Sequence, residues 1–197
     1  MRVFIVYCHP SDESFTAKVK EQFIRGLKLA GHTYEISDLY AMDFQSDFTR
    51  EEYERDAYYA EDGYISGDVL AEQQKVQGCD AIVFIYPVFW TEAPAKLVGW
   101  FNRVWTHGFA YGDKQSMHVL EKALFLVTSG KTLEQLQESK EAQAMVTVML
   151  GDRIGYRAKQ KNMVFFPGMS HANEDVREAN MLTYIDQAFR LGAEIDK

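Results

Sequence analysis

Four short segments hold the residues whose types and spacing could bind a ligand, and each of them follows an apolar run. They are "CHPSDESFT" (8–16), "YPVFWTEAP" (86–94), "TSGKT" (128–132) and "FPGMSHANEDVR" (166–177). Hydroxyl, glycine and arginine groups are typical donors to phosphate, and neighbouring aromatic rings are typical contacts of a flat ring system. The pattern favours a ligand that has an anionic end and a planar end.

The first segment joins a strand-like run to a helix-like pattern. Ser14 is well placed as the N-cap of that helix, where its side chain would accept a hydrogen bond from the backbone two or three residues later. The positive end of a helix also binds anions through free N–H groups, so the loop is a candidate phosphate site as well. The chain has no GxxxxGK[ST] and no GxGxxG sequence, which counts against nucleoside triphosphate chemistry.

The other three segments each allow a structural explanation beside a functional one. Phe89 and Trp90 suit a flat ring, but loop aromatics also pack at subunit interfaces. Gly130 would let the backbone approach a ligand closely, although a glycine turn is a weak motif. Arg177 could meet a phosphate, or it could form a surface ion pair with Glu174.

The sequence contains no constellation typical of nucleophilic or metal chemistry. Cys8 ends an apolar run and is expected to be a buried, inert thiol. The histidines show neither HxH nor HxxxH spacing, so no metal is expected; they stand at positions 9, 32, 107, 118 and 171. The chemistry is therefore expected to come from a bound organic cofactor.

The periodicity of apolar residues predicts the elements that position these segments. Strands are expected at 2–7, 33–39, 79–87, 122–130 and 162–168. Helices are expected from Ser14 to a left-handed cap at Gly31, and over 67–78, 93–105, 133–149 and 174–191, the last ending at Gly192. The aromatic-rich stretch 40–67 is weakly periodic and predicts a long excursion with a short helix at 49–59.

This order of elements predicts an α/β fold with one doubly wound, five-stranded parallel sheet and helices on both faces. The strands are continuously apolar, as strands covered on both faces are. We expect a single domain over 1–197, because there is no repeat, linker or low-complexity tract. The ligand crevice should lie at the carboxyl ends of the strands, where all four segments meet.

The composition argues against some classes of binding partner. The formal net charge is −8, from 21 basic and 29 acidic residues, which makes affinity for nucleic acid or an anionic membrane surface improbable. Two cysteines form no disulfide framework, and no apolar run reaches the length of a signal sequence or a membrane span. We expect a cytoplasmic protein without membrane insertion.

Longer motifs point to a family. "SDLYAMDF", "ISGDVLAEQ", "YPVFW" and "GWFNRVWTHGFAYG" together resemble the NAD(P)H:quinone oxidoreductases of the DT-diaphorase type, and the resemblance runs over nearly the whole chain. It implies a flavodoxin-like fold, bound FAD (FMN as second choice), and NADH or NADPH as co-substrate. It also implies a quinone-like acceptor and a homodimer with active sites at the subunit interface.

The resemblance assigns the four segments to parts of the flavin. The matches to the phosphate loop are His9, Ser14, Phe15 and Thr16. The matches to the loop along the flavin ring are Pro87, Val88, Phe89, Trp90 and Thr91. The matches to a turn at the pyrimidine edge, which usually reads Thr-Thr-Gly-Gly, are Thr128, Ser129, Gly130 and Lys131.

Three further residues match positions outside these loops. Gln73 matches a glutamine near the adenosine part of FAD, and Arg177 matches an arginine near its phosphates or adenine. Tyr111 matches an aromatic of the nicotinamide and quinone pocket, so the expected catalytic residues are Phe89, Trp90, Tyr111 and Lys131.

The chain departs from the family's mammalian members beyond the pyrimidine-edge turn. Those members have a tyrosine and a histidine there, which are credited with stabilising charge on the reduced flavin, and "SGKTLEQLQESKEAQ" has neither at that spacing. We hypothesise that Lys131, or the backbone N–H groups beside it, supplies the positive potential instead. Asn102 also stands where those members have a glutamate.

Three other functions fit the same fold. One is a regulatory flavoprotein subunit of a potassium efflux system, and another is a nitroreductase or azoreductase. A third is an electron-carrier flavodoxin, but flavodoxins lack the "GWFNRVW…GFAYG" region and the long excursion at 40–67.

Overall fold

A parallel sheet of five strands forms the centre of the molecule in this computed structural model, which describes residues 1–60 and 62–197. The strands are β1 (Arg2–Tyr7), β2 (Thr33–Asp38), β3 (Ala81–Pro87), β4 (Leu120–Thr128) and β5 (Ala158–Phe166). Their order is β2-β1-β3-β4-β5, and every neighbouring pair is parallel. The order reverses between β1 and β3, so the predicted doubly wound, flavodoxin-like topology is confirmed.

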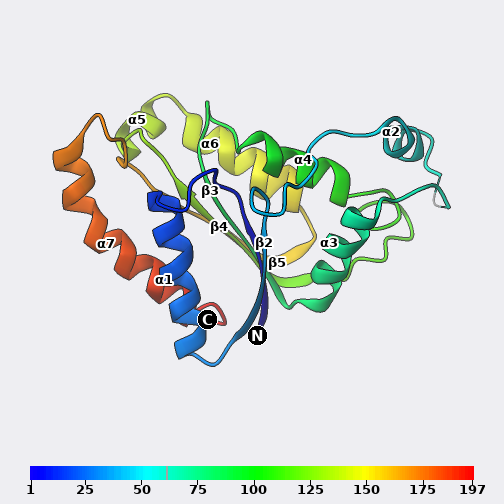
Figure 1. Cartoon of the computed structure of the whole chain (residues 1–197), viewed down its shortest axis with the longest axis horizontal. Helices are drawn as coiled ribbons and strands as arrows, with labels where there is room; N and C mark the ends of the chain where they lie inside the picture. Colours follow the sequence, from blue (N-terminus) through cyan, green and yellow to red (C-terminus); the bar gives the residue numbers. More distant parts are fainter. Residues whose placement is uncertain (61) are drawn as a thin grey trace.

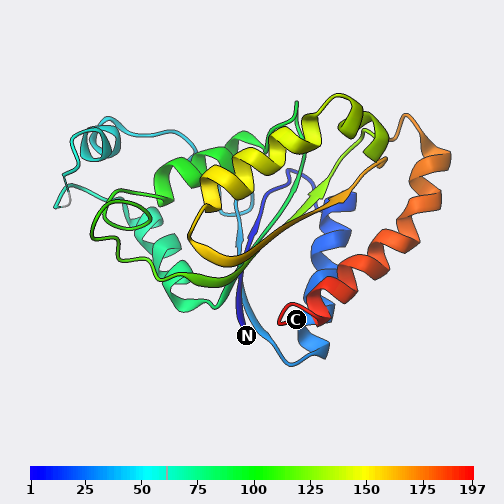
Figure 2. The ribbon, with the colours of Figure 1, turned by 180° about the vertical axis from the view of Figure 1, so that it is seen from behind.

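Helices cover both faces of the sheet (Figures 1 and 2). On one face α1 (Phe15–Leu29) and α7 (Glu174–Ala193) pack against alternate residues of the central strands. The helices on the other face are α3 (Gly67–Gly78), α4 (Ala95–Val104), α5 (Leu133–Glu138), α6 (Glu141–Val146) and the π-helix η1 (Thr147–Ile154). All seven residues of β3 are buried, which explains its continuously apolar sequence.

Two glycines let α1 and α7 pack closely. A Cβ atom on Gly26 would lie 2.1 Å from the Phe189 carbonyl oxygen, and one on Gly192 would lie 2.1 Å from the Phe23 carbonyl oxygen. Gly192 was expected to end the last helix, and that expectation is wrong, because α7 continues to Ala193. Position 192 is glycine because the close packing of α1 against α7 leaves no room for a side chain. Gly31, with φ +76°, is the predicted left-handed cap of α1.

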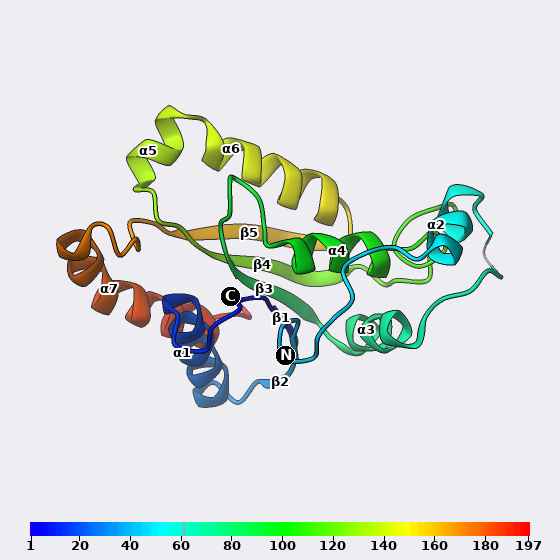
Figure 3. The ribbon, with the colours of Figure 1, turned by 45° about the horizontal axis from the view of Figure 1, so that its top comes forward.

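The excursion after β2 carries α2 (Arg50–Ala57), which lies away from the sheet beside the loop that follows α4 (Figures 1 and 3). It is held by Arg103 of α4, whose guanidinium donates to Glu52 at 2.6 Å and to Asp68 at 2.6 Å. The same group donates to the Ser66 hydroxyl and to the Gln45 carbonyl oxygen. The buried arginine therefore fastens the excursion to the helix layer.

The expected helix at 133–149 is the largest error in the predicted elements. Lys140 adopts a left-handed conformation, with φ +62°, and separates α5 from α6. The helical path then continues as η1 to Ile154, and β5 begins at Ala158 instead of 162. Exposed polar residues fill the first half of β5, so hydrophobicity reveals only its second half.

Candidate functional site

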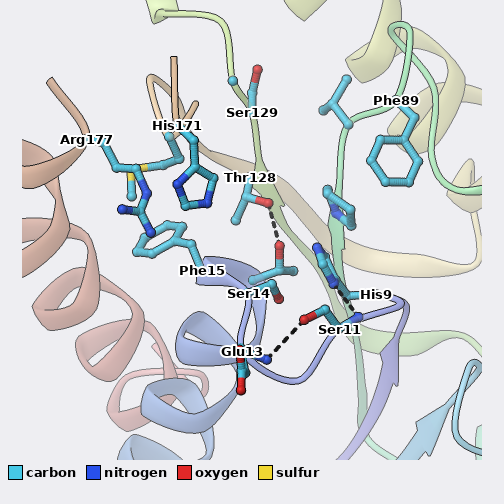
Figure 4. A pocket seen from close by; sticks show the side chains of 15 residues that line it. His9, Ser11, Glu13, Ser14, Phe15, Phe89, Thr128, Ser129, His171 and Arg177 are labelled. Carbon is cyan, nitrogen blue, oxygen red and sulfur yellow. Dashed lines mark hydrogen bonds between the residues drawn. The ribbon is translucent and has the colours of Figure 1, made fainter. Parts of the chain in front are cut away.

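A cavity of about 550 Å³ opens at the carboxyl ends of β1, β3 and β4. Figure 4 shows Phe89 on one side of this crevice and Arg177 on the other, with His9, Ser14 and Thr128 between them. Eleven of the expected site residues line it: His9, Ser14, Phe15, Thr16, Pro87, Val88, Phe89, Thr128, Ser129, Gly130 and Arg177. The crevice lies where the strand order reverses, as predicted.

The N-terminus of α1 forms one end of the crevice. Ser14 is the N-cap, and its side chain accepts a hydrogen bond from the Ala17 N–H at 3.1 Å. The N–H groups of Phe15 and Thr16 have no acceptor among the described residues. Free N–H groups at a helix N-terminus bind anions, so this end suits a phosphate.

His9 adds a neutral donor beside these N–H groups. Its Nδ1 accepts the Ser11 backbone N–H at 2.9 Å, so the proton of the neutral ring is on Nε2. Burial holds the pKa of His9 below its ordinary value. The ring can therefore donate one hydrogen bond into the crevice without introducing a charge.

Arg177 supplies a positive charge at the same end. No carboxylate within the described part of the chain lies within ion-pair distance of its guanidinium, so the surface pair with Glu174 is not formed. Its Nε is buried and has no hydrogen-bond partner there. A guanidinium in this state is suited to an anionic ligand.

A two-residue hairpin forms the opposite wall. The Phe89 N–H donates to the Glu92 carbonyl at 2.8 Å and the Glu92 N–H to the Phe89 carbonyl at 3.0 Å. Between them Trp90 and Thr91 are left-handed, with φ +53° and +66°. Such a turn favours glycine or asparagine, and each residue of another type costs about 1–3 kcal/mol. The turn leaves Trp90 100% exposed and Phe89 45% exposed.

The turn after β4 completes the crevice. The Val88 N–H donates to the Thr128 carbonyl at 2.8 Å, and the Thr128 hydroxyl meets the Thr16 hydroxyl at 2.7 Å, so the three loops are joined. The N–H groups of Trp90, Thr91 and Gly130 have no acceptor among the described residues. These three amides, rather than those of Val88 and Phe89, are free to bond the polar edge of a flat ligand.

Lys131 lies beside this turn, but its charge is balanced. Its ammonium group donates to both carboxylate oxygens of Glu141, at 2.6 and 2.8 Å. Hydrogen bonds from Lys131 in turn hold the pKa of Glu141 below its ordinary value. Of the two sources of positive potential in our hypothesis, this pairing favours the backbone N–H groups.

Two expected site residues lie away from the crevice. Gln73 is buried on α3, where its amide donates to the Val104 carbonyl and the Thr106 hydroxyl at 3.0 Å each. Tyr111 lines a second cavity, and its hydroxyl lies 3.4 Å from a carboxylate oxygen of Asp56. Within one chain, neither side chain reaches the crevice.

Four residues line the crevice that were not among the expected site residues, namely Ser11, Glu13, Met169 and His171. Met169 and His171 are brought in by the loop after β5, which bends at Gly168 with φ +71°. The Met169 N–H donates to the Ser129 carbonyl at 2.9 Å, which fastens this loop to the β4 turn. The proline and glycine before Met169 are the sequence signal for that bend.

The described residues give little support to nucleophilic thiol chemistry or to metal chemistry. Burial raises the pKa of Cys8 to about 12, so the thiol is protonated and unreactive, as expected. Within residues 1–60 and 62–197, no group of three or more His, Cys, Asp or Glu side chains could hold a metal ion. In the same residues, no helix has the length and apolarity needed to cross a membrane.

Several known proteins are similar to this chain in sequence or in fold. The sequence profile of the flavodoxin-like fold family matches residues 1–153. The structure of an NAD(P)H:quinone oxidoreductase from Methanothermobacter marburgensis is 40% identical, with a TM-score of 0.91 over 100% of this chain and 98% of that one.

Two further proteins are similar over different extents. Ribosyldihydronicotinamide dehydrogenase [quinone] of Rattus norvegicus is 35% identical over 150 residues, which is 68% of this chain and 65% of that protein. This chain therefore spans less than two thirds of the rat protein's length. An FMN-dependent NADH-azoreductase from Bacillus anthracis, solved in complex with FMN, is 16% identical with a TM-score of 0.63 over 98% of this chain and 100% of that one, and shares the fold alone. The matched profile and the full-length similarity at 40% identity show that the chain belongs to the flavodoxin-like NAD(P)H:quinone oxidoreductases.

Proposed function

We propose that this chain is a flavin-dependent oxidoreductase, which takes a hydride from NADH or NADPH and passes it to a quinone-like acceptor. The crevice carries the proposal, because it has free anion donors at one end and a flat wall with free amides at the other. A planar cofactor that carries phosphate fits both ends. The names of the matched relatives support the same chemistry.

The residues of the crevice divide the binding of a flavin between them. The Phe15 and Thr16 N–H groups, His9 Nε2–H and Arg177 would hold the phosphate end. The ring would lie along Phe89 and the β4 turn. When bound, the flavin supplies the hydride-accepting and hydride-donating ring. We propose FAD as the cofactor, with FMN as second choice, because Arg177 stands across the crevice from Phe89 and offers a donor for a longer, diphosphate-linked ligand (Figure 4).

The protein's own contribution is orientation and electrostatics rather than acid–base chemistry. The hydrogen bond from the Val88 N–H to the Thr128 carbonyl fixes the two loops that would contact the ring. The free N–H groups of Trp90, Thr91 and Gly130 would face its polar edge and offset negative charge that builds up there. No proton needs to be held on a side chain for this role.

We infer that the enzyme works as a homodimer. Exposed aromatic side chains gather on and around α2, at Phe48, Tyr53, Tyr58, Tyr59 and Tyr64. Large exposed apolar surfaces of this kind mark protein interfaces. Tyr111 would then line the acceptor site of the partner's flavin, which accounts for its position outside its own crevice. Sedimentation velocity tests this inference, and a monomer at micromolar concentration would contradict it.

The decisive experiment identifies the cofactor and then measures turnover. The purified protein is heated, the released cofactor is identified by mass, and oxidation of NADH and NADPH is followed with menadione. We expect FAD and menadione-dependent turnover with at least one of the two nucleotides. A colourless protein without affinity for FAD or FMN would overturn the proposal, and bound flavin without NAD(P)H oxidation would indicate an electron carrier.

A further inference from the structure

A second cavity of about 480 Å³ lies between α2, α4 and η1. Its walls are largely aromatic and include Tyr53, Trp105 and Tyr111, and two arginines, Arg153 and Arg157, enter it from η1 and the turn that follows. Aromatic walls accept a planar ring, and guanidinium groups select for anions. Tyr111 was expected in an acceptor pocket, whereas the two arginines were not among the expected site residues.

Arg153 has a largely buried side chain and one long ion pair. Its side chain is only 14% exposed, and its guanidinium stacks 5.0 Å above the centre of the Phe101 ring. Its guanidinium forms a long ion pair with Glu92, at 3.7 Å, and Nη1 lies 3.7 Å from the Met149 sulfur. No oxygen of the described residues accepts a hydrogen bond from this guanidinium. Because its one ion pair within the described residues is long and none of their oxygens accepts a hydrogen bond from it, this guanidinium can still donate to an anionic ligand.

Arg157 adds a positive charge that no carboxylate of the described residues neutralises. Its Nε donates to the Ala110 carbonyl at 2.7 Å, and Nη1 lies 3.4–3.5 Å from the carbonyl oxygens of residues 152–154. Its guanidinium also lies 4.9 Å from the Tyr156 ring. No described carboxylate is within ion-pair distance, so carbonyl dipoles hold the group in place and leave its charge available to a ligand.

The acidic side chains of the cavity do not cancel these charges. Asp56 is paired with Arg55 at 2.7 Å and contacts the Tyr111 hydroxyl. Asp152 is exposed to solvent, where water screens its charge. Two guanidinium groups therefore line the cavity, and among the described residues Glu92 alone forms an ion pair with them.

The π-helix explains how Arg153 comes to this position. Such helices are rare and frequent at functional sites, and η1 extends over eight residues. The Arg153 carbonyl oxygen accepts the Trp105 indole N–H at 2.7 Å, which fixes η1 against the loop after α4. Figures 2 and 3 show this helical path running beside α4. The hydrogen bond from Trp105 fixes the backbone of Arg153, and the Phe101 ring contacts its guanidinium.

The cavity is linked to the crevice through the hairpin that carries Trp90. Phe89 at the start of this hairpin lines the crevice, and Glu92 at its end is the carboxylate nearest to Arg153. The Glu92 Oε1 accepts the N–H of Ala93 at 2.8 Å, so Glu92 is only partly engaged with the arginine. The hairpin that the proposed function places along the flavin ring therefore also contacts Arg153 of the second cavity through Glu92.

We propose that this second cavity binds the anionic substituent of a planar aromatic acceptor, such as a ring-bound carboxylate or sulfonate, and that Arg153 is the residue that recognises it. The inference rests on the proposed function and narrows its acceptor from quinones in general to those that carry a negative charge. Arg153 is a specificity-determining residue here, because it selects the acceptor and takes no part in hydride transfer.

The test compares two ligands of nearly equal shape that differ in charge, naphthoate and naphthamide, by titration calorimetry on the flavin-loaded protein. We expect the wild type to bind naphthoate at least about tenfold more tightly. Arg153→Met should remove most of this preference, and Arg153→Lys should retain part of it, because lysine keeps the charge. Naphthamide affinity should change by less than about twofold in both variants.

Turnover provides a second readout. Arg153→Met should lower kcat/KM for a naphthoquinone sulfonate about tenfold more than it lowers kcat/KM for neutral menadione. Arg190→Met is the matched control, because the Arg190 side chain is 71% exposed and, among the described residues, its ion pair is with Asp186 on α7. NADH and NADPH are compared in the same variants, since a 2′-phosphate is an alternative source of the anion.

The outcomes separate this inference from the proposed function. Equal affinity of the wild type for naphthoate and naphthamide would overturn the inference even if the variants fail to fold. A change confined to the NADPH-to-NADH ratio would also overturn it, because it would assign Arg153 to the co-substrate. Absence of menadione turnover with the flavin-loaded wild type would instead contradict the proposed function.

Discussion

Two arginines of this chain lie in opposite surroundings. Arg103 on α4 is 3% exposed and is bound by the Glu52 and Asp68 carboxylates, a hydroxyl and a carbonyl oxygen. Arg177 at the start of α7 is partly buried, its Nε has no partner, and no described carboxylate is within ion-pair distance. One guanidinium is therefore fully satisfied by its own chain, and the other is not.

This difference separates polar groups that hold the fold from those that bind a ligand. A buried polar network with complete partners stabilises one arrangement, whereas an unpaired group costs free energy until a ligand completes it. The Arg103 network fastens α2 and its described neighbours to α4, and none of its residues lines the crevice. Arg177 and the free N–H groups of Phe15 and Thr16 are available to bind an anion.

The largest effect is expected from breaking the satisfied network. Arg103→Met would leave two buried or half-buried carboxylates unpaired and should lower the free energy of unfolding by about 3–5 kcal/mol. Urea unfolding measures this loss, and Arg190→Met, at an exposed ion pair, should change it by less than about 1 kcal/mol. Similar effects of the two substitutions would contradict a structural role for the Arg103 network.

The same network should make stability depend on acid pH. Burial alone would raise the pKa values of Glu52 and Asp68, but hydrogen bonds from Arg103 outweigh it and hold both below their ordinary values of 4.5 and 3.8. Because the unfolded chain takes up these protons first, the stabilisation is present above those values and is lost as pH falls through the folded pKa values. The gap in unfolding free energy between wild type and Arg103→Met should therefore shrink on acidification; a gap that is independent of pH would rule the ion pairs out as its source.

Breaking the unsatisfied site should affect binding and leave folding unchanged. Arg177→Met should weaken FAD binding by about tenfold, as the loss of a charged hydrogen bond does, with little change in the free energy of unfolding of the flavin-free protein. Fluorescence titration of the flavin-free protein measures the affinity. Arg25→Met is the control, since Arg25 on α1 donates a hydrogen bond to Gln22 and forms no ion pair with a described residue. A loss of stability without a change in affinity would contradict this role, because Arg177 would then stabilise the fold as Arg103 does.

Gly130 tests how closely a ligand approaches the β4 turn. A Cβ atom there would lie 3.4 Å from Ser170 Cβ, an ordinary contact, so Gly130→Ala should fold normally. If the flavin approaches this backbone closely, its affinity should fall by about threefold to tenfold. Gly67→Ala, where no atom lies within 4 Å, should leave the affinity unchanged.

The smallest effect is expected at Lys131. Because Glu141 already neutralises its ammonium group, Lys131→Met should change the rate of flavin reduction by NADH by less than about threefold. Stopped-flow absorbance measures the rate. A tenfold loss would indicate that the lysine side chain, and not the backbone N–H groups, stabilises the reduced flavin.

The local elements of this fold follow from its sequence because they depend on neighbours along the chain. The buried strand at β3 is continuously apolar, Ser14 caps α1, and Gly31 ends that helix in the left-handed conformation. The order of strands and helices then predicts the parallel sheet and the position of its crevice. Eleven of the expected site residues line that crevice for this reason.

Contacts between distant segments were decided only in the tertiary structure. Gly192 lies inside α7 because the backbone of α1 passes too close for a side chain, and no local pattern reports that approach. Likewise, Gln73 faces Val104 and Thr106, and Lys131 meets Glu141, because of how the helix layer packs. Sequence determined which donors and rings this protein has and where the crevice forms; packing decided which of them are satisfied within the chain and which remain open to a ligand.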